Sequence, residues 1–292
     1  MTKIDIFSGF LGAGKTTLIR KLIAEGYKGE NALQLIMLDA LAKRLRQKRF
    51  RHGSINFDTE ELHFDIDEKG KHTRCYFKRS KDANKLIEEF MLLAYRTVAE
   101  SVACPGKGKK PKTLPYRIHD DPDPQKLENL RELTAKLGYK MKSTSTKGAT
   151  ARALNKLMEE VDGHREAKLV QTIALRSMMK AKYSTHNIGH FGLAFDYYTH
   201  FTSPIRRYPD TMVHRLLTRY QDGGRSANKN HYEELCEHCS DMEQIAQNAE
   251  RDSIKYKMVE FMGEFVGEEF DAHISGCLLY TSPSPRDPKT SR

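Results

Sequence analysis

The first residues able to carry chemistry form a glycine-rich loop near the start of the chain. The stretch SGFLGAGKTTLI fits G-x-x-x-x-G-K-[ST], a pattern in which glycines let the backbone fold around a phosphate. The run KIDIF before it and TLIRKLIAEG after it predict a strand and a helix, so strand, loop and helix come in the required order. Amides at the helix start would point at the anion, lysine would add charge, and a threonine hydroxyl would reach Mg²⁺. The candidate nucleotide-binding residues are Gly9, Gly12, Gly14, Lys15, Thr16 and Thr17.

A second group of chemically capable residues lies in HFGLAFDYYTHFTSPIRRYPD, residues 190–210. Aromatic rings stack on bases and guanidinium groups bind phosphates, so this mixture is typical of a surface for single-stranded nucleic acid. A plainer alternative is an aromatic core strand followed by two surface arginines. The candidate nucleic-acid-binding residues here are Tyr198, His200, Arg206, Arg207 and Tyr208.

The elements around these residues can be predicted from local pattern. Apolar residues alternate over residues 191–195, which predicts a strand. A hydroxyl residue before Pro204 predicts that a helical turn starts there, which would put Arg206 beside a helix N-terminus that favours an anion. Pro209 has no N–H to donate, so the turn must kink or restart. The helix that follows should bury Val213, Leu216, Leu217 and Tyr220 and end at Gly223-Gly224.

Periodicity elsewhere predicts an α+β fold. Asp123 is a candidate N-cap and Pro124 a first helical residue, with Leu127, Leu130 and Leu133 as the buried stripe and Gly138 as the stop. Further helices are predicted at residues 31–50, 84–100 and 235–249, and two strands within residues 50–67 with a turn at 58–60.

Composition limits the class of protein. Lys and Arg outnumber Asp and Glu by 49 to 39, giving a net charge of +10, which favours a polyanionic partner such as nucleic acid. No apolar run approaches the roughly 20 residues of a membrane span, so we expect a soluble protein with no membrane partner. The five cysteines are odd in number and scattered, and no secretory signal precedes them, so we expect a reduced, cytoplasmic setting.

Metal ligation has weaker signals. Cys236 and Cys239 enclose His238, but no second pair stands at zinc-finger spacing, and we interpret these cysteines as core residues of a helix. His190, His200 and His214 share no ligand spacing, so packing or RNA contact is the better interpretation. The sequence assigns no metal-binding residue.

Residues 1–30 resemble the start of the CobW-like family of GTP-dependent metal chaperones. That resemblance implies GTP as a ligand of the phosphate loop. The family would continue into a second apolar strand, an acidic switch segment and a Cys-x-Cys-Cys motif, none of which follows. A single strand and helix cannot bury their apolar faces alone, so the loop lacks the sheet that normally supports it.

Most of the remaining chain resembles the ribonuclease II and ribonuclease R family. The resemblance rests on HFGLAFDYYTHFTSPIRRYPD, AKRLRQKRFRHGSINFDTEELHF, ANKLIEEFMLLAYRTVAE, LPYRIHDDPDPQKLENLRELTAKLGY and the segment from CEHCSDMEQ to DAHISG. It implies an RNB domain, a processive 3′-to-5′ exoribonuclease that acts on single-stranded RNA with Mg²⁺ and releases nucleoside 5′-monophosphates.

Site residues carry over from that resemblance by position. The first arginine of the SPIR motif, here Arg206, would contact the phosphate at the cleavage site and is the candidate catalytic residue. Glu89, with Glu88 as second choice, would lie by the 3′-terminal nucleotide, and Glu250 of the A-E-R-D motif would lie near the RNA end. Tyr95 stands where the family usually has asparagine.

The largest departure from the family is its D-x-D-D-type run of Mg²⁺-binding aspartates, which would stand upstream of the matched segments. Metal-assisted hydrolysis needs such grouped carboxylates. Neither Asp65 with Asp67 nor the group Asp120, Asp121 and Asp123 matches that run. We therefore expect impaired activity, with an RNA-binding module without catalysis as an alternative.

The sequence predicts four segments. Residues 1–30 form the phosphate-loop unit, with a chimeric join to a partial RNB domain at residues 31–262. Residues 263–276 resemble the start of an OB-fold domain, and residues 277–292, which begin CLLYTSPSPRD, resemble a translated transposase-type sequencing adapter and are expected to be disordered.

Overall fold

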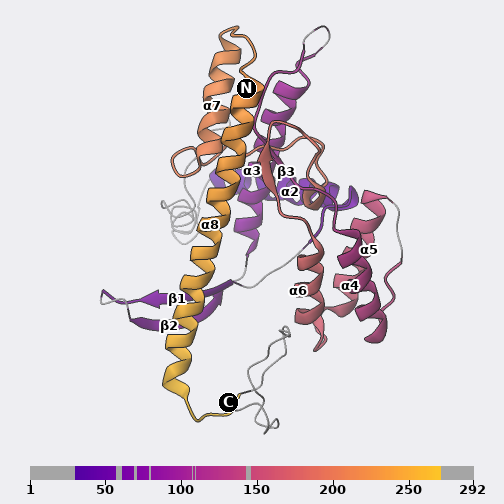
Figure 1. Cartoon of the computed structure of the whole chain (residues 1–292), viewed down its shortest axis with the longest axis vertical. Helices are drawn as coiled ribbons and strands as arrows, with labels where there is room; N and C mark the ends of the chain where they lie inside the picture. Colours follow the sequence, from indigo (N-terminus) through magenta and orange to yellow (C-terminus); the bar gives the residue numbers. More distant parts are fainter. Residues whose placement is uncertain are drawn as a thin grey trace, which may run out of the picture.

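Helices form most of the secondary structure in the computed structural model, which describes residues 30–56, 61–68, 71–78, 80–106, 108, 110–142 and 146–270. The predicted phosphate loop at residues 9–17 and the predicted tail at 277–292 lie outside these residues. The helices are α2 (Glu30–Arg51), α3 (Asp82–Ala103), α4 (Pro124–Lys136), α5 (Lys147–Val161), α6 (Ala167–Ser177), α7 (Tyr208–Gln221) and α8 (Lys229–Met262), arranged as in Figure 1. The strands are β1 (Glu61–Ile66), β2 (His72–Lys78), β3 (Tyr116–Ile118) and β4 (Lys182–Ser184), and short 3₁₀ helices span Phe191–Leu193 and Gly263–Phe265. The mixture confirms the α+β prediction.

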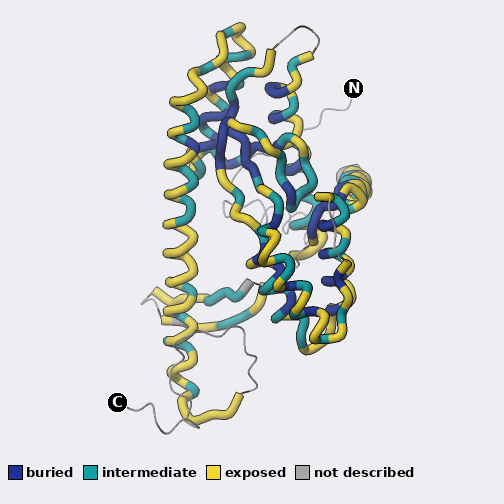
Figure 2. The backbone as a smooth tube through the Cα atoms, turned by 45° about the vertical axis from the view of Figure 1, so that its right-hand side comes forward, coloured by how far each residue is buried: buried dark blue, intermediate teal, exposed yellow. Residues whose placement is uncertain are grey.

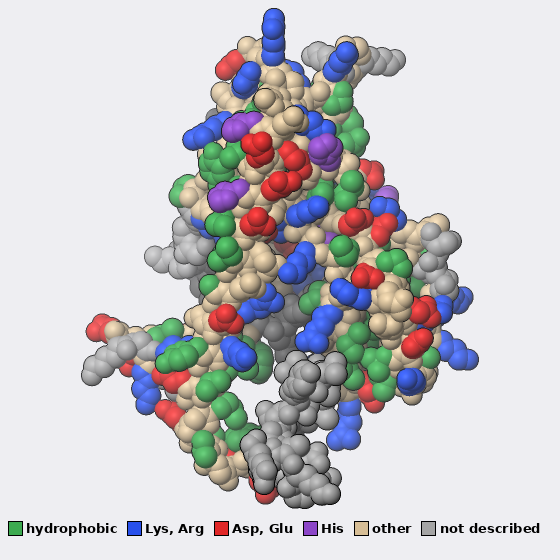
Figure 3. Space-filling model, in the orientation of Figure 1, with side chains coloured by type: hydrophobic (Ala, Val, Ile, Leu, Met, Phe, Trp, Pro, Cys, Tyr) green, Lys and Arg blue, Asp and Glu red, His purple; other side chains and the backbone are tan. Residues whose placement is uncertain are grey.

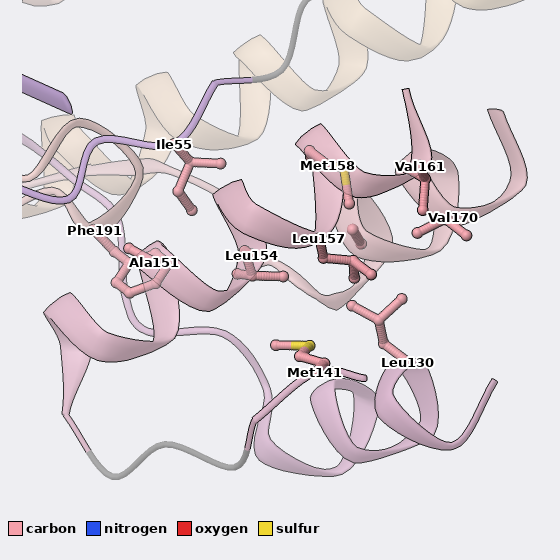
Figure 4. Packing of buried hydrophobic residues seen from close by; sticks show 11 residues of the cluster. Ile55, Leu130, Met141, Ala151, Leu154, Leu157, Met158, Val161, Val170 and Phe191 are labelled. Atoms are coloured by element: carbon pink, nitrogen blue, oxygen red, sulfur yellow. The ribbon is translucent and has the colours of Figure 1, made fainter. Parts of the chain in front are cut away.

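One core lies among α4, α5 and α6. Leu154 and Leu157 of α5 point toward Leu130 of α4, and Val161 faces Val170 of α6 (Figure 4). The Asp123 side chain accepts hydrogen bonds from the first amides of α4, and the chain reverses at Gly138 with φ of +92°, as the sequence predicts. The same core also includes Ile55, which follows α2, and Phe191 of the first 3₁₀ helix.

A second core joins α3, α7 and the β3–β4 pair. Val213 and Leu216 of α7, both fully buried, pack with Ala99 of α3 and Ile118 of β3. These α7 residues were predicted from their helical spacing, and α7 ends close to the predicted glycine pair. Strands β3 and β4 are antiparallel, with Arg117 opposite Tyr183. The Arg117 amide donates to the Tyr198 carbonyl and His119 bridges His190, so β3 lies beside the candidate RNA-binding segment.

Helix α8 runs along one side of the molecule and is exposed for most of its length (Figures 1 and 2). Its first half contacts β4 and α7, where Cys236 is buried with Tyr183 and Met212. Its far end meets the β1–β2 hairpin, where the Phe64 and Phe261 rings lie 6.1 Å apart. None of the described helices combines the length and the apolar character needed to cross a membrane.

Two predicted strands take other forms. Residues 191–193 form a 3₁₀ helix, and Ala194 then adopts φ of +53°, because the His190 side chain caps this turn by accepting a hydrogen bond from the Leu193 amide. The first strand predicted within residues 50–67 is also wrong over the described residues. Ile55 is irregular, and its amide donates to the Gly192 carbonyl instead of to a neighbouring strand. The second predicted strand corresponds to β1.

Candidate RNA-binding site

Arg206 lies on a turn that directly precedes α7. The turn spans residues 204–206, and regular helix begins at Tyr208. The predicted restart at Pro209 is therefore correct, because the first amides of a helix need no intrahelical acceptor and proline is tolerated there. Arg206 is consequently two residues before the helix instead of within its first turn.

The turn is held from both sides while the Arg206 side chain is left exposed. The Ser203 amide donates to Asp210 Oδ2 at 2.8 Å, and the Thr211 hydroxyl donates to the Pro204 carbonyl at 2.6 Å. Within the described residues the Arg206 guanidinium has no hydrogen bond or ion pair, and its neighbour Ile205 is 81% exposed. A fixed turn thus presents a free cation to solvent.

Arg207 makes the opposite set of contacts. Its Nε donates to Asp210 Oδ1 at 2.6 Å and its Nη2 to Asp210 Oδ2 at 2.8 Å, a bidentate pair with a carboxylate that is fully buried. Nη2 also donates to the Tyr95 hydroxyl at 3.2 Å. Burial opposes the charge on Arg207, but the hydrogen bonds and charge of Asp210 outweigh burial and raise the pKa of Arg207. The sequence predicted that Arg207 contacts RNA. In the structure its guanidinium is instead paired with the buried carboxylate of Asp210.

The aromatic candidates divide between core and surface. Tyr198 is buried, and its ring lies edge-on to Tyr95 and to His200, each with centroids 5.6 Å away. The Tyr183 hydroxyl lies 2.7 Å from His200 Nδ1. Burial, with Arg207 and Arg117 nearby, holds the pKa of His200 well below its ordinary value, so this ring is neutral at pH 7. Tyr198 and His200 thus pack inside the protein, as the alternative of an aromatic core segment predicts. Tyr208, by contrast, is 47% exposed beside the turn.

Glu89, the candidate for the 3′-terminal nucleotide, faces inward from α3. Its carboxylate is 3% exposed and lies 2.5 Å from Arg49 Nη2 of α2. Glu88, the second choice, is half-exposed and lies 3.4 Å from the same nitrogen. Arg49 in turn donates to Ser54 Oγ at 2.8 Å. Sequence reasoning missed Arg49, because one arginine in a helix rich in basic residues carries no signal of an inward direction.

Glu250 lies on the far half of α8. It is exposed, and at 1.5 Å per residue it stands about 30 Å along the helix from Lys229. Among the described residues, no hydrogen bond or ion pair connects Glu250 with Arg206 or Glu89. The described contacts therefore connect Arg207 and Tyr198 with the turn that carries Arg206. They do not connect Glu89 or Glu250 with that turn.

The available carboxylates do not fit a Mg²⁺ site. Asp123 is used as a helix cap, and Asp121 lies 3.1 Å from Lys147 Nζ. Asp67 accepts from the Lys71 amide in the hairpin turn. Over the described residues no group of three or more potential metal ligands exists. Cys236 is a core thiol, fully buried with Tyr183 and Met212, and burial raises its pKa to about 12.

Comparisons with known proteins agree with this fold. A family model described as "RNB domain" matches residues 15–223, beginning inside the predicted phosphate loop. Ribonuclease R of Aquifex aeolicus is 40% identical over 249 residues, which cover 84% of this chain and 34% of that protein. The chain thus spans about a third of the length of such a relative.

Solved structures of related proteins also match the fold of this chain. RNase R of Mycoplasma genitalium in complex with double-stranded RNA has a TM-score of 0.76 at 25% identity, covering 89% of this chain and 47% of that one. The same enzyme in complex with ribose-methylated single-stranded RNA has a TM-score of 0.75 at 24% identity, covering 86% and 40%. The family model matches more than half of the residues and the fold agrees, so the chain belongs to the RNB-domain family.

Proposed function

We propose that this chain is the RNA-holding part of a 3′-to-5′ exoribonuclease of the ribonuclease R type, and that Arg206 binds a backbone phosphate of single-stranded RNA. The observation that carries the proposal is the exposed Arg206 guanidinium on a turn fixed by Ser203, Asp210 and Thr211. Guanidinium groups bind phosphate through charge-assisted hydrogen bonds, and a preformed turn lowers the entropy lost on binding. The exposed Tyr208 supplies a ring beside it for base stacking.

Membership of the RNB-domain family supports the choice of substrate. The Mycoplasma genitalium RNase R structures hold single-stranded and double-stranded RNA, and the net charge of +10 favours a polyanion. The complete family enzyme is expected to release nucleoside 5′-monophosphates. Mg²⁺ would supply charge neutralisation and an activated water for that hydrolysis.

We further propose that this chain, by itself, binds RNA and hydrolyses it weakly or not at all. Within the described residues Asp123 caps α4, Asp121 pairs with Lys147, and no group of three or more potential metal ligands exists. The roles of Glu89 and Glu250 at the RNA end rest on the family resemblance, and the segment boundaries at residues 30, 262 and 276 rest on sequence alone.

Binding and cleavage by the purified chain test these proposals together. Fluorescence anisotropy with a 3′-tailed single-stranded RNA should show binding that Arg206→Ala weakens about tenfold or more, because a charge-assisted phosphate contact is lost. Arg215→Ala removes the same charge from an exposed position of α7 and should have a smaller effect. Equal losses in both variants would contradict a specific role of Arg206. Robust Mg²⁺-dependent shortening of the RNA would contradict the expected loss of hydrolysis.

A second candidate function is GTP binding at the N-terminal loop, favoured by the match of residues 9–16 to the phosphate-loop pattern. Binding of a fluorescent GTP analogue that is lost in Lys15→Ala would support it. No detectable binding of the analogue at high micromolar concentration would rule out GTP binding as a function of this loop. RNA binding that is unchanged in Lys15→Ala would show that the two candidate functions are independent.

A further inference from the structure

We propose that Tyr95 is a positioning residue, which ties helix α3 to the turn that carries Arg206 and so fixes the direction in which that arginine meets RNA. The proposal rests on the proposed role of Arg206.

The Tyr95 hydroxyl lies at the junction of three segments. It is 2.6 Å from Thr202 Oγ1 and accepts from Arg207 Nη2 at 3.2 Å, so it contacts the chain on both sides of Arg206. The ring is 4% exposed and lies edge-on to Tyr198. Aromatic packing therefore fixes the ring, and the ring fixes where its hydroxyl can form hydrogen bonds.

The same network continues into α7. Asp210 binds the Arg207 side chain through both carboxylate oxygens and also accepts from the Ser203 amide. The Arg207 amide donates to the Ser203 carbonyl at 3.0 Å, which closes the turn. The backbone around Arg206 is thus connected to α7 through Asp210 and to α3 through Tyr95.

This connection matters because a phosphate contact depends on orientation. A side chain held within a small angular range loses less entropy on binding than one on a loose turn, so supporting hydrogen bonds act on affinity through the residue that they position. An asparagine at position 95 is shorter than tyrosine and could not place a donor or acceptor at the same point. The tyrosine therefore supplies a link that a shorter polar side chain at this position would not supply.

A double-mutant cycle in the 292-residue chain distinguishes positioning from simple stabilisation. Tyr95→Phe keeps the buried ring and removes only the hydroxyl, and Tyr220→Phe removes a hydroxyl that bonds to Thr113 and Ala227 at the other end of α7. With a 3′-tailed single-stranded RNA, Tyr95→Phe should weaken binding about three- to tenfold, the loss of roughly one hydrogen bond, and Tyr220→Phe should not. In the Arg206→Ala background, Tyr95→Phe should cause no further loss of RNA affinity.

Amide hydrogen exchange gives a second readout that needs no RNA. Tyr95→Phe should speed exchange at Ser203 and Arg207 while leaving Val213, in the buried part of α7, unchanged. Additive losses in the cycle, or exchange that does not change at the turn, would overturn the positioning role. If Arg206→Ala does not weaken RNA binding, the proposed function is contradicted, and the exchange result still decides whether Tyr95 holds the turn.

Discussion

At the scale of single residues, the most informative group is the carboxylate of Asp210. It is fully buried, and its two oxygens accept hydrogen bonds from Arg207 and from the Ser203 amide. A buried charge is tolerated only when it is paired, so the pair restricts both the start of α7 and the preceding turn. Neighbouring arginines therefore have different roles, Arg207 internal and Arg206 external.

Asp210→Asn should lower the free energy of unfolding by about 3 kcal/mol, because it leaves the partly buried Arg207 charge without its counter-charge. Urea unfolding followed by circular dichroism measures this loss. Asp222→Asn is the control, since Asp222 is exposed at the other end of α7, and this variant should change stability by less than about 0.5 kcal/mol. A comparable loss of stability in both variants would show that the Arg207–Asp210 pair contributes no more to stability than an exposed carboxylate does.

At the scale of elements, α5 is the centre of the α4–α6 lobe. Leu154 is fully buried there, with Leu130 and Phe191 in the same core (Figure 4). Leu154→Ala should destabilise the protein by about 2–5 kcal/mol, because it removes apolar contacts and leaves a cavity. Leu175→Ala on α6, where the side chain is 52% exposed, should cost less than about 1 kcal/mol in the same urea experiment. Similar losses would contradict the core that the structure assigns to this lobe.

The turn at His190 makes stability depend on pH. Burial, with His119 and Arg117 nearby, lowers the pKa of His190 from 6.5 to about 3. Below pH 6.5 the unfolded chain takes up a proton on this ring that the folded protein resists until about pH 3. The free energy of unfolding should therefore fall as the pH is lowered through this window.

Carboxylates also titrate below pH 6.5, so a variant of His190 is needed to separate its contribution to the pH dependence from theirs. His190→Asn keeps a hydrogen-bond acceptor for the Leu193 amide but has no proton to gain. Urea unfolding at pH 7.0, 6.0 and 5.0, values chosen to lie above most carboxylate pKa values, should show a weaker pH dependence in this variant. Identical slopes would mean that His190 is accessible to protons in the folded state.

At the scale of the whole molecule, charge is distributed unevenly. On the face shown in Figure 3, acidic side chains gather over the first half of α8, whereas Lys and Arg side chains lie at the upper edge and over the lower half of this face. Glu233, in the first half of α8, accepts hydrogen bonds from the Ser184 hydroxyl and from the amide and hydroxyl of Thr185 and so holds α8 against β4. RNA should avoid the acidic side chains over the first half of α8 and bind where Lys and Arg side chains are not paired with carboxylates.

Affinity for single-stranded RNA should fall with salt, because each neutralised phosphate releases condensed counterions. On a plot of log affinity against log salt concentration, Arg206→Ala should reduce the slope by about 0.7, the contribution of one phosphate contact. Anisotropy titrations between 50 and 300 mM KCl, a range around physiological ionic strength, measure both slopes. An unchanged slope would mean that Arg206 does not contact a phosphate.

The sequence by itself determined the elements whose signals are local. Asp123, Pro124 and Gly138 mark the ends of α4 through capping chemistry that involves only neighbouring residues, and the spacing of Val213 and Leu216 identifies the buried face of α7. The position of Arg206 just before a helix follows from Pro204 and Pro209 on either side of it. Residues 9–17 carry an equally local signal, and it stays a prediction.

Only the tertiary structure decided which polar side chains face inward. Arg49 and Glu89 are 40 residues apart in sequence and Tyr95 and Arg207 are 112 apart, so no local period relates them. The alternation at residues 191–195 was interpreted as a strand, but the His190 cap and the Gly192 contact with Ile55 favour a 3₁₀ turn there. A buried polar group is stable only beside its partner, and that partner comes from a distant part of the chain. The fold therefore decides which of two adjacent arginines pairs internally and which remains free to bind RNA.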